Sequence, residues 1–300
     1  MRLSVQHIEK FEFEPAALST IQVCRLTPRD HTGHYVCEWS VEVDADCDLS
    51  NREDAFGNIV TSFSVNKPLE RLTIRSLGEI ETEQHHGVVR GTREGVPLGV
   101  FLRVTDDDDH VAQTKQLLEM ADTHDRSPID RLHALMTALH AITGDDDTRE
   151  ASSNGGEGAP GANGTITPQQ SQSQSSDPVP KSAQRFADAL RAKQSGNPAL
   201  PAMLLADAAR LIGIPARLIS GHRLLSEQAR NTDTRDVWAE MFVEKLGWIG
   251  FDPRRNNCPS DESVRIAAGL NLPGISALRV NHHTQQGEAT RHTEIALSRA

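Results

Sequence analysis

The sequence is poor in aromatic side chains and in positive charge relative to negative charge. Aromatic residues make up 4% of the 300 positions, so we expect those few to occupy fixed packing sites. Lys and Arg number 31 against 42 Asp and Glu, which gives a formal net charge of −11. A surface of that sign disfavours nucleic acids and anionic membranes as partners, because both are negatively charged. The charge also promotes solubility, so it identifies no particular partner.

Long apolar runs and cysteines are scarce as well. No run reaches the roughly 18 consecutive apolar residues of a membrane-spanning helix, and Met1–Val5 lack the apolar stretch of a signal peptide. The four cysteines, Cys24, Cys37, Cys47 and Cys258, lack the short spacings of metal sites. We therefore expect reduced thiols in a cytoplasmic protein, with no metal and no cofactor. Cys24 and Cys37 lie in strand-like runs and are expected to be buried.

Residues 1–105 show short apolar runs with alternation, separated by turn residues, which is typical of a β domain. One of these runs contains His7. Because a metal site needs three or four donors, a packed or hydrogen-bonded structural role is favoured for His7. Asp54–Asn58 predicts a turn, since Asp opens it and Gly-Asn tolerates positive φ. The predicted strands are residues 3–8, 21–26, 35–43, 59–65, 72–80 and 88–89.

Residues 106–143 are predicted to form helices that lead into a second domain. The four acids Asp106–Asp109 suggest calcium, but the Gly and terminal Glu of an EF-hand loop do not follow. Acids favour the beginning of a helix, so a helix over 111–120 is the preferred interpretation. A second helix is predicted from Ser127, a capping residue followed by proline, to residue 142.

Residues 144–181 are rich in Gly, Ser and Gln and contain no aromatic residue. Such a segment buries too little apolar surface to offset its loss of conformational entropy. We predict a disordered, dispensable insertion.

Residues 182–300 are predicted to form an α+β domain. Apolar residues at helical spacing over 204–212 end at Gly213, a natural helix cap. Strands are predicted over 214–221, 237–243 and 246–251. Two further strands, over 276–283 and 290–298, are expected to close the same sheet.

Four motifs in this second domain lie in an ungapped order: Gly213–Arg217 (GIPAR), Ser220-Gly221, Trp238–Glu240 (WAE) and Gly247–Pro253 (GWIGFDP). They resemble the core of the transglutaminase-like superfamily, in its bacterial branch. The resemblance implies an α+β fold, in which an N-terminal β domain precedes a papain-like transglutaminase core with a helix packed on an antiparallel sheet. Residues 1–105 also resemble the N-terminal domain of that branch, through His7, Arg25–Pro28 and Asp54–Asn58.

Active members of this family are expected to use a Cys nucleophile, a His base and an Asp that orients the imidazole. An ungapped count back from Gly213 places Pro198 at the Cys position, and Asp236 precedes Val237-Trp238 at the His position. Asp252 retains the third position. Proline has no nucleophile, and a carboxylate does not replace an imidazole poised near neutral pH. The resemblance therefore predicts a degenerate catalytic triad.

The prolines Pro198 and Pro201 also disturb the first turn of the core helix. With Asn197 as the cap and Pro198 first, Pro201 would lack the N–H of the first intrahelical hydrogen bond. Either the helix begins at Pro201 or its first turn is distorted.

The two acids Asp236 and Asp252 are expected to lie side by side and to repel one another. An arginine bridge or a shared proton is favoured over a divalent ion, since two carboxylates alone make a weak metal site. The candidate cations are Arg235, Arg254 and Arg255. With this repulsion in place, Asp236→Asn is expected to be neutral or stabilising.

The sequence therefore favours an inactive protein that binds a protein or peptide partner, or scaffolds a complex. The alternative is an active peptidase, amidase or transglutaminase that uses non-standard groups. Cys258 could serve as a relocated nucleophile, but no His stands at the matching base position.

Overall fold

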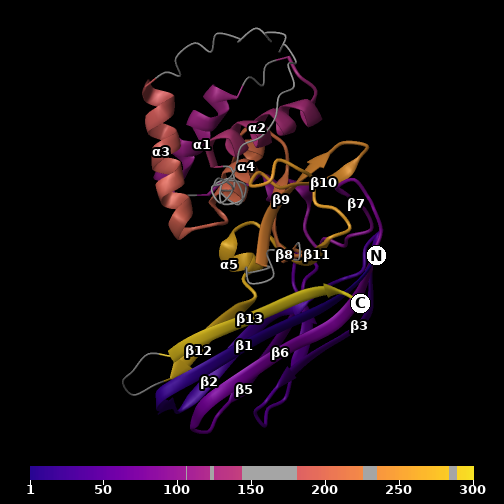
Figure 1. Ribbon diagram of the computed structural model, residues 1–300, viewed down its shortest axis with the longest axis vertical. Coiled ribbons are helices and arrows are strands. Elements are labelled where there is room, and N and C mark those ends of the chain that lie inside the picture. The colour runs from indigo at the N-terminus through magenta and orange to yellow at the C-terminus, as the bar shows by residue number, and fades with distance from the viewer. Residues whose placement is uncertain (106, 122–124, 144–180, 226–234, 284–288) are drawn as a thin grey trace, which may run out of the picture.

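The computed structural model describes residues 1–105, 107–121, 125–143, 181–225, 235–283 and 289–300. Figure 1 shows a strand-rich part at the bottom and a part with helices at the top, joined by a seam at which α5 lies. Within the described ranges, no helix has the length and apolar character needed to cross a membrane. The low-complexity segment 144–181 falls almost wholly outside the described residues.

The strand-rich part consists of two four-stranded sheets packed face to face. One has the order β13-β1-β6-β3 and the other β12-β2-β5-β4. Phe11, Leu72, Phe63 and Leu26 belong to the buried core between them. The six N-terminal strands of this strand-rich part, which we call the sandwich, are β1 (Arg2–Ala17), β2 (Ser19–Thr27), β3 (His34–Val43), β4 (Ser50–Glu53), β5 (Ile59–Val65) and β6 (Leu69–Thr82).

The C-terminal strands β12 (Leu278–His283) and β13 (Ala289–Arg299) belong to this sandwich. β12 pairs with β2, and β13 pairs along β1 from Leu3 opposite Arg299 to Phe13 opposite Ala289. The expectation that these two strands close the core sheet is therefore wrong. Alternation identifies a strand but does not name its partner, and here the tail covers backbone edges of β1 and β2 that would otherwise be open.

The core sheet has the order β11-β8-β9-β10-β7. β7, predicted as part of the N-terminal domain, joins it through Trp248 opposite Val89. β11, which the sequence pattern did not reveal, forms the other edge. The strands of the core sheet are β7 (Val88–Val89), β8 (Ala216–Arg223), β9 (Arg235–Val243), β10 (Gly247–Phe251) and β11 (Ser263–Gly269).

Four helices cover one face of the core sheet. Leu204, Leu205 and Ala208 of α4 are fully buried in a cluster with Ala216, Leu218, Ala239 and Met241 of the sheet. The helices are α1 (Asp108–Met120), α2 (Pro128–Thr143), α3 (Lys181–Gly196) and α4 (Leu200–Leu211), with a 3₁₀ turn η1 (Leu98–Leu102) before them and α5 (Leu272–Ile275) at the seam.

The predicted helix starts are confirmed by their caps. The carboxylate of Asp107 accepts hydrogen bonds from the backbone N–H groups of Asp109 and His110. At α2, the Ser127 hydroxyl accepts from the backbone N–H of Asp130 at 3.3 Å, as an N-cap does, and donates to the Asp130 carboxylate at 2.6 Å. The acid run thus caps a helix.

α4 begins at Leu200, so Pro201 sits in the first turn, where a missing N–H costs no intrahelical hydrogen bond. The Asn197 side chain accepts from the Ala199 N–H at 3.2 Å. The helix start is therefore shifted, as in the first of the two predicted outcomes, but to Leu200 and not to Pro201. Gly213, with φ of 81°, ends the helix as expected.

One burial prediction fails. Cys24 is buried, but Cys37 is exposed. The pairing of β3 with β6 shifts register between Val36 and Glu38, and this bulge reverses the expected alternation.

Candidate functional site

The three positions that the sequence resemblance assigns to the triad lie on different elements. Pro198 is exposed in the turn that precedes α4. Asp236 lies near the start of β9 and Asp252 directly follows β10, where it forms an isolated β-bridge with Asn257. Val237 and Ala239 contribute to the core under α4, so Asp236 faces the opposite side of the sheet. Among the described residues, no hydrogen bond joins Pro198 to the two acids.

The structure brings Asp236 and Asp252 together and places two arginines between them. Arg223 donates through Nε to Asp236 Oδ2 at 3.0 Å and through Nη2 to Asp252 Oδ2 at 2.9 Å. Arg255 Nη1 lies 2.9 Å from each of the same two oxygens. These four residues form what we call the aspartate quartet. The arginine bridge predicted from sequence is present.

Arg255 was among the predicted cations, and Arg223 was missed. Arg223 ends β8, two residues after Gly221, which pairs with Asp236. Residues two apart in a strand lie on the same face, so knowledge of this register would have predicted that Arg223 lies beside Asp236. Of the other candidates, Arg254 contributes its backbone N–H, which donates to Asp252 Oδ1 at 3.0 Å.

Two positive and two negative charges balance within the aspartate quartet. Both carboxylates are almost fully buried. Burial, together with the neighbouring Asp236 carboxylate, raises the pKa of Asp252 against the pull of Arg223 and Arg255. Burial alone would lower the pKa of Arg255, but the two carboxylates raise it. The bridging oxygens already accept from guanidinium groups, and the described chain holds no cluster of three His, Cys, Asp or Glu suited to a metal.

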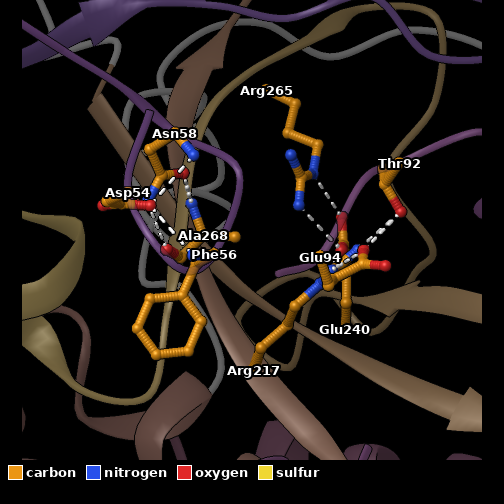
Figure 2. A network of polar contacts seen from close by, with 9 residues as sticks. All are labelled: Asp54, Phe56, Asn58, Thr92, Glu94, Arg217, Glu240, Arg265 and Ala268. Carbon is orange, nitrogen blue, oxygen red and sulfur yellow. Dashed lines mark hydrogen bonds and ion pairs between the residues drawn. The ribbon is translucent and has the colours of Figure 1, made fainter. Parts of the chain in front are cut away.

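A second charged network lies farther along the same two strands (Figure 2). Glu240 is fully buried, and its carboxylate accepts from Arg217 Nε at 2.7 Å and Arg265 Nε at 2.9 Å. Arg217 also contacts Glu94 and lies over the Trp248 ring at 3.9 Å from its centroid. We call this the glutamate network.

Burial by itself would raise the pKa of Glu240, but Arg265 and Arg217 outweigh it and lower the pKa to about 2. The carboxylate is therefore ionised at neutral pH and already saturated by donors. It fixes three strands and the Glu94 loop to one another and offers no proton acceptor to a substrate.

The Asp54–Asn58 turn fastens the sandwich to the core sheet (Figure 2). The Asn58 amide donates to the Ala268 carbonyl and accepts from the Ala268 N–H, both at 2.7 Å. Asp54 accepts from the N–H groups of Phe56 and Asn58 at 3.0 Å. Gly57 has φ of 82°, as the predicted turn requires. The motif is structural, as expected, and its role is to hold two domains together.

Cys258 does not have the surroundings of a nucleophile. It is half-buried, and burial raises the pKa of its thiol. An activated cysteine needs the opposite shift, since the thiolate is the reactive form. The structure therefore gives no support to a relocated nucleophile at this position.

Comparison with known proteins agrees with the geometry. The family model described as the bacterial transglutaminase-like N-terminal region matches residues 3–81. The model of the transglutaminase-like superfamily core matches residues 166–253. A search of the curated proteins gave no match.

Two solved structures are similar. A candidate cysteine protease from Cytophaga hutchinsonii is 12% identical, with a TM-score of 0.65, and the match covers 99% of this chain and 90% of that one. The periplasmic domain of TgpA from Pseudomonas aeruginosa is 15% identical, with a TM-score of 0.30, over 82% of this chain and 86% of that one. The first likeness shows a shared fold and the second adds nothing to it. The chain thus belongs to the transglutaminase-like superfamily, with a bacterial transglutaminase-like N-terminal region ahead of the core.

Proposed function

We propose that this chain is a catalytically inactive member of the superfamily that acts as a binding or scaffold module for a protein or peptide partner. The observation that carries the proposal is the aspartate quartet. Where the family expects an imidazole held by a carboxylate, two carboxylates share two guanidinium groups. The quartet contains no imidazole that could act as a base, and Pro198 supplies no nucleophile.

A second proposal concerns the compartment. All four cysteines are free thiols, including the exposed Cys37. Free thiols persist where glutathione and thioredoxin keep them reduced, so we place the protein in the cytoplasm. The charge of −11 supports partners other than nucleic acid or an anionic membrane.

The activity proposal is tested by transfer of a glutamine-containing peptide to hydroxylamine, followed as hydroxamate, and by hydrolysis of the same peptide. We expect no turnover above a blank without protein. Turnover by the wild type that is lost in Cys258→Ala or Asp252→Ala would overturn the proposal. Those two variants also separate true activity from a contaminant, because a contaminant would survive both changes.

A restoration variant sharpens this test. Pro198→Cys combined with Asp236→His reinstates the family residues at two positions. We expect no recovery of full activity, because Arg223 and Arg255 remain around Asp252 and would repel an imidazolium formed there. Full recovery would show that the quartet does not block the site.

A further inference from the structure

A cavity of ≈ 270 Å³ lies at the seam between the sandwich and the core. Strands β1, β2 and β13 line it from the sandwich, and β8, β9, β11 and α5 line it from the core. Figure 1 places α5 at this junction. We call it the seam cavity, and its polar lining includes His7, Arg25, Ser220, Arg235, Asp236 and Arg291.

The buried polar atoms of this lining that have no hydrogen-bond partner among the described residues include His7 Nδ1, Arg25 Nη1 and Ser220 Oγ. The His7 side chain is only 2% exposed. Buried polar atoms are nearly always paired in native proteins. A polar ligand in this cavity would supply partners for three such atoms.

The hydrogen bond to Glu9 orients His7. His7 Nε2 lies 2.8 Å from Glu9 Oε1. The pKa of Glu9 is lowered to about 2 because hydrogen bonds from Arg291, His7 and Thr293 outweigh its burial. An ionised carboxylate only accepts, so Nε2 carries a hydrogen, and the tautomer with its one ring hydrogen there leaves Nδ1 as an acceptor. His7 thus requires a donor from the ligand.

Arg25 requires the reverse. Its Nε donates to Asp54 Oδ2 at 3.1 Å, and Nη1 remains a donor. Arg291 also lines the cavity, but both of its hydrogen-bonding nitrogens already donate to Glu9. Arg25 Nη1 therefore needs an acceptor from the ligand, and the fork of a guanidinium suits a carboxylate.

The lining also contains the apolar side chains of Leu26, Val237, Ile266, Leu272 and Ile275. A ligand that fits this lining has an aliphatic body, a carboxylate and a nearby N–H donor. These are the features of an N-acylated aliphatic amino acid, which is also the chemistry of the C-terminal residue of a peptide.

We propose that the seam cavity binds such an N-acyl amino acid group. The carboxylate accepts from Arg25 and the Ser220 hydroxyl, the amide N–H donates to His7 Nδ1, and the aliphatic side chain packs on Ile266 and Ile275. This names the ligand class of the binding module and so rests on the proposed function. Binding is measured without any assay of turnover, so each idea fails by a different result.

Isothermal titration with three matched probes tests the ligand chemistry. N-acetyl-L-leucine carries all three features, N-acetyl-L-leucinamide lacks the carboxylate, and 4-methylpentanoate lacks the N–H. We expect the first to bind about tenfold or more tightly than either of the others, since each loses a buried hydrogen bond. Equal affinity for the acid and its amide, or no saturation below about 10 mM by any probe, would overturn the proposal.

Ser220→Ala tests the location. Its hydroxyl has no protein partner among the described residues, so the substitution is expected to leave the melting temperature unchanged and to weaken N-acetyl-L-leucine binding by about 3- to 10-fold. Ser263→Ala is the matched control, because that hydroxyl is also buried and unpaired but lines a different, smaller cavity. Its affinity should equal that of the wild type. Equal effects of the two variants, or no shift of the Gly221 amide resonance during titration, would refute the location.

Discussion

The glutamate network and the aspartate quartet lie on the same face of the core sheet and differ in how their charges are arranged. In the first, one fully buried carboxylate, Glu240, lies between two arginines. In the second, two carboxylates lie against each other and share their arginines. The two sites are a few residues apart, since Arg217 pairs with Glu240 and Gly221 with Asp236 across β8 and β9.

The comparison shows that similar sets of charges can shift the pKa of a carboxylate in opposite directions. Two cations around one anion lower the pKa of Glu240 to about 2 after overcoming its burial. Two anions side by side, both buried, raise the pKa of Asp252 although two cations are present. The first network uses Arg217 and Glu240, which belong to the motifs that resemble the family. The second occupies two positions that the sequence resemblance assigns to the catalytic triad, and its two carboxylates still repel each other.

The largest effect is expected for Glu240→Gln. The change leaves Arg217 and Arg265 buried without their shared anion and should cost about 3 to 5 kcal/mol of unfolding free energy. Urea denaturation measures this loss. Glu79→Gln is the control, because Glu79 pairs with Arg2 near the surface and should change stability by no more than about 0.5 kcal/mol. A loss of less than about 1 kcal/mol at Glu240 would contradict the assigned role.

The second prediction concerns acid. His34, whose Nε2 accepts from the Arg265 N–H, has its pKa lowered to about 4, first by burial and then by Arg265. Burial and His34 lower the pKa of His31 to about 2. Below pH 6.5, the pKa of these histidines in the unfolded chain, the unfolded state binds protons that the folded state does not bind. The stabilisation is therefore fully present above pH 6.5 and decreases as the pH falls toward 4. His34 alone accounts for about 3 kcal/mol at pH 4.

Urea denaturation at pH 7 and pH 4.5 checks the acid prediction. His34→Gln should reduce the difference between the two pH values, whereas His292→Gln, at an exposed position, should leave it unchanged. An identical pH dependence in wild type and His34→Gln would show that the acid response has another origin.

Asp236→Asn should have a smaller effect than Glu240→Gln, although both neutralise one buried carboxylate. It removes an anion that two arginines contact, but it also relieves the repulsion of Asp252. We expect a loss of about 1 to 2 kcal/mol, where repulsion alone predicted a neutral or stabilising change. Thermal melting and urea denaturation at neutral pH measure it.

A double variant sharpens that comparison. Adding Arg255→Gln to Asp236→Asn restores the charge balance, so the pair should lose less stability than the sum of the single variants. Strict additivity would mean that Arg255 and Asp236 do not interact in solution.

An effect no larger than that of Asp236→Asn is expected for Asn58→Ala, which tests whether the sandwich positions β11 and with it Arg265 of the glutamate network. The side chain of Asn58 makes two hydrogen bonds to Ala268, and their loss should cost about 1 to 2 kcal/mol. Hydrogen exchange should rise at the Ala268 amide and remain unchanged at the Val237 amide near the aspartate quartet. Faster exchange at both sites would indicate global destabilisation.

Local pattern predicted most of the strands and helices. The run over 59–65 matches β5, and the Ser127 and Asp107 caps lie where side-chain chemistry places them. The pairing partners of the strands were harder to predict, because the alternation in β12 and β13 is compatible with pairing to any open sheet edge. β11 escaped notice because Ser263, Arg265 and Gly269 interrupt its apolar pattern.

The site shows the same division. Opposed acids at positions 236 and 252, with an arginine between them, followed from the family motifs. Arg223 did not, because its place depends on the register of β8 against β9. The seam cavity was also unpredictable, since its walls come from strands at both ends of the chain.

The position of β13 carries a consequence for how the protein is made. During translation β1 is synthesised more than 270 residues before β13, yet the two strands pair along most of their length. The sandwich therefore cannot be completed until the core and the C-terminal strands have been synthesised. Until then, β1 and β2 lack their outer partner strands. During that interval the open edges are exposed to other chains, so the N-terminal strands depend on a late segment for protection against misassociation.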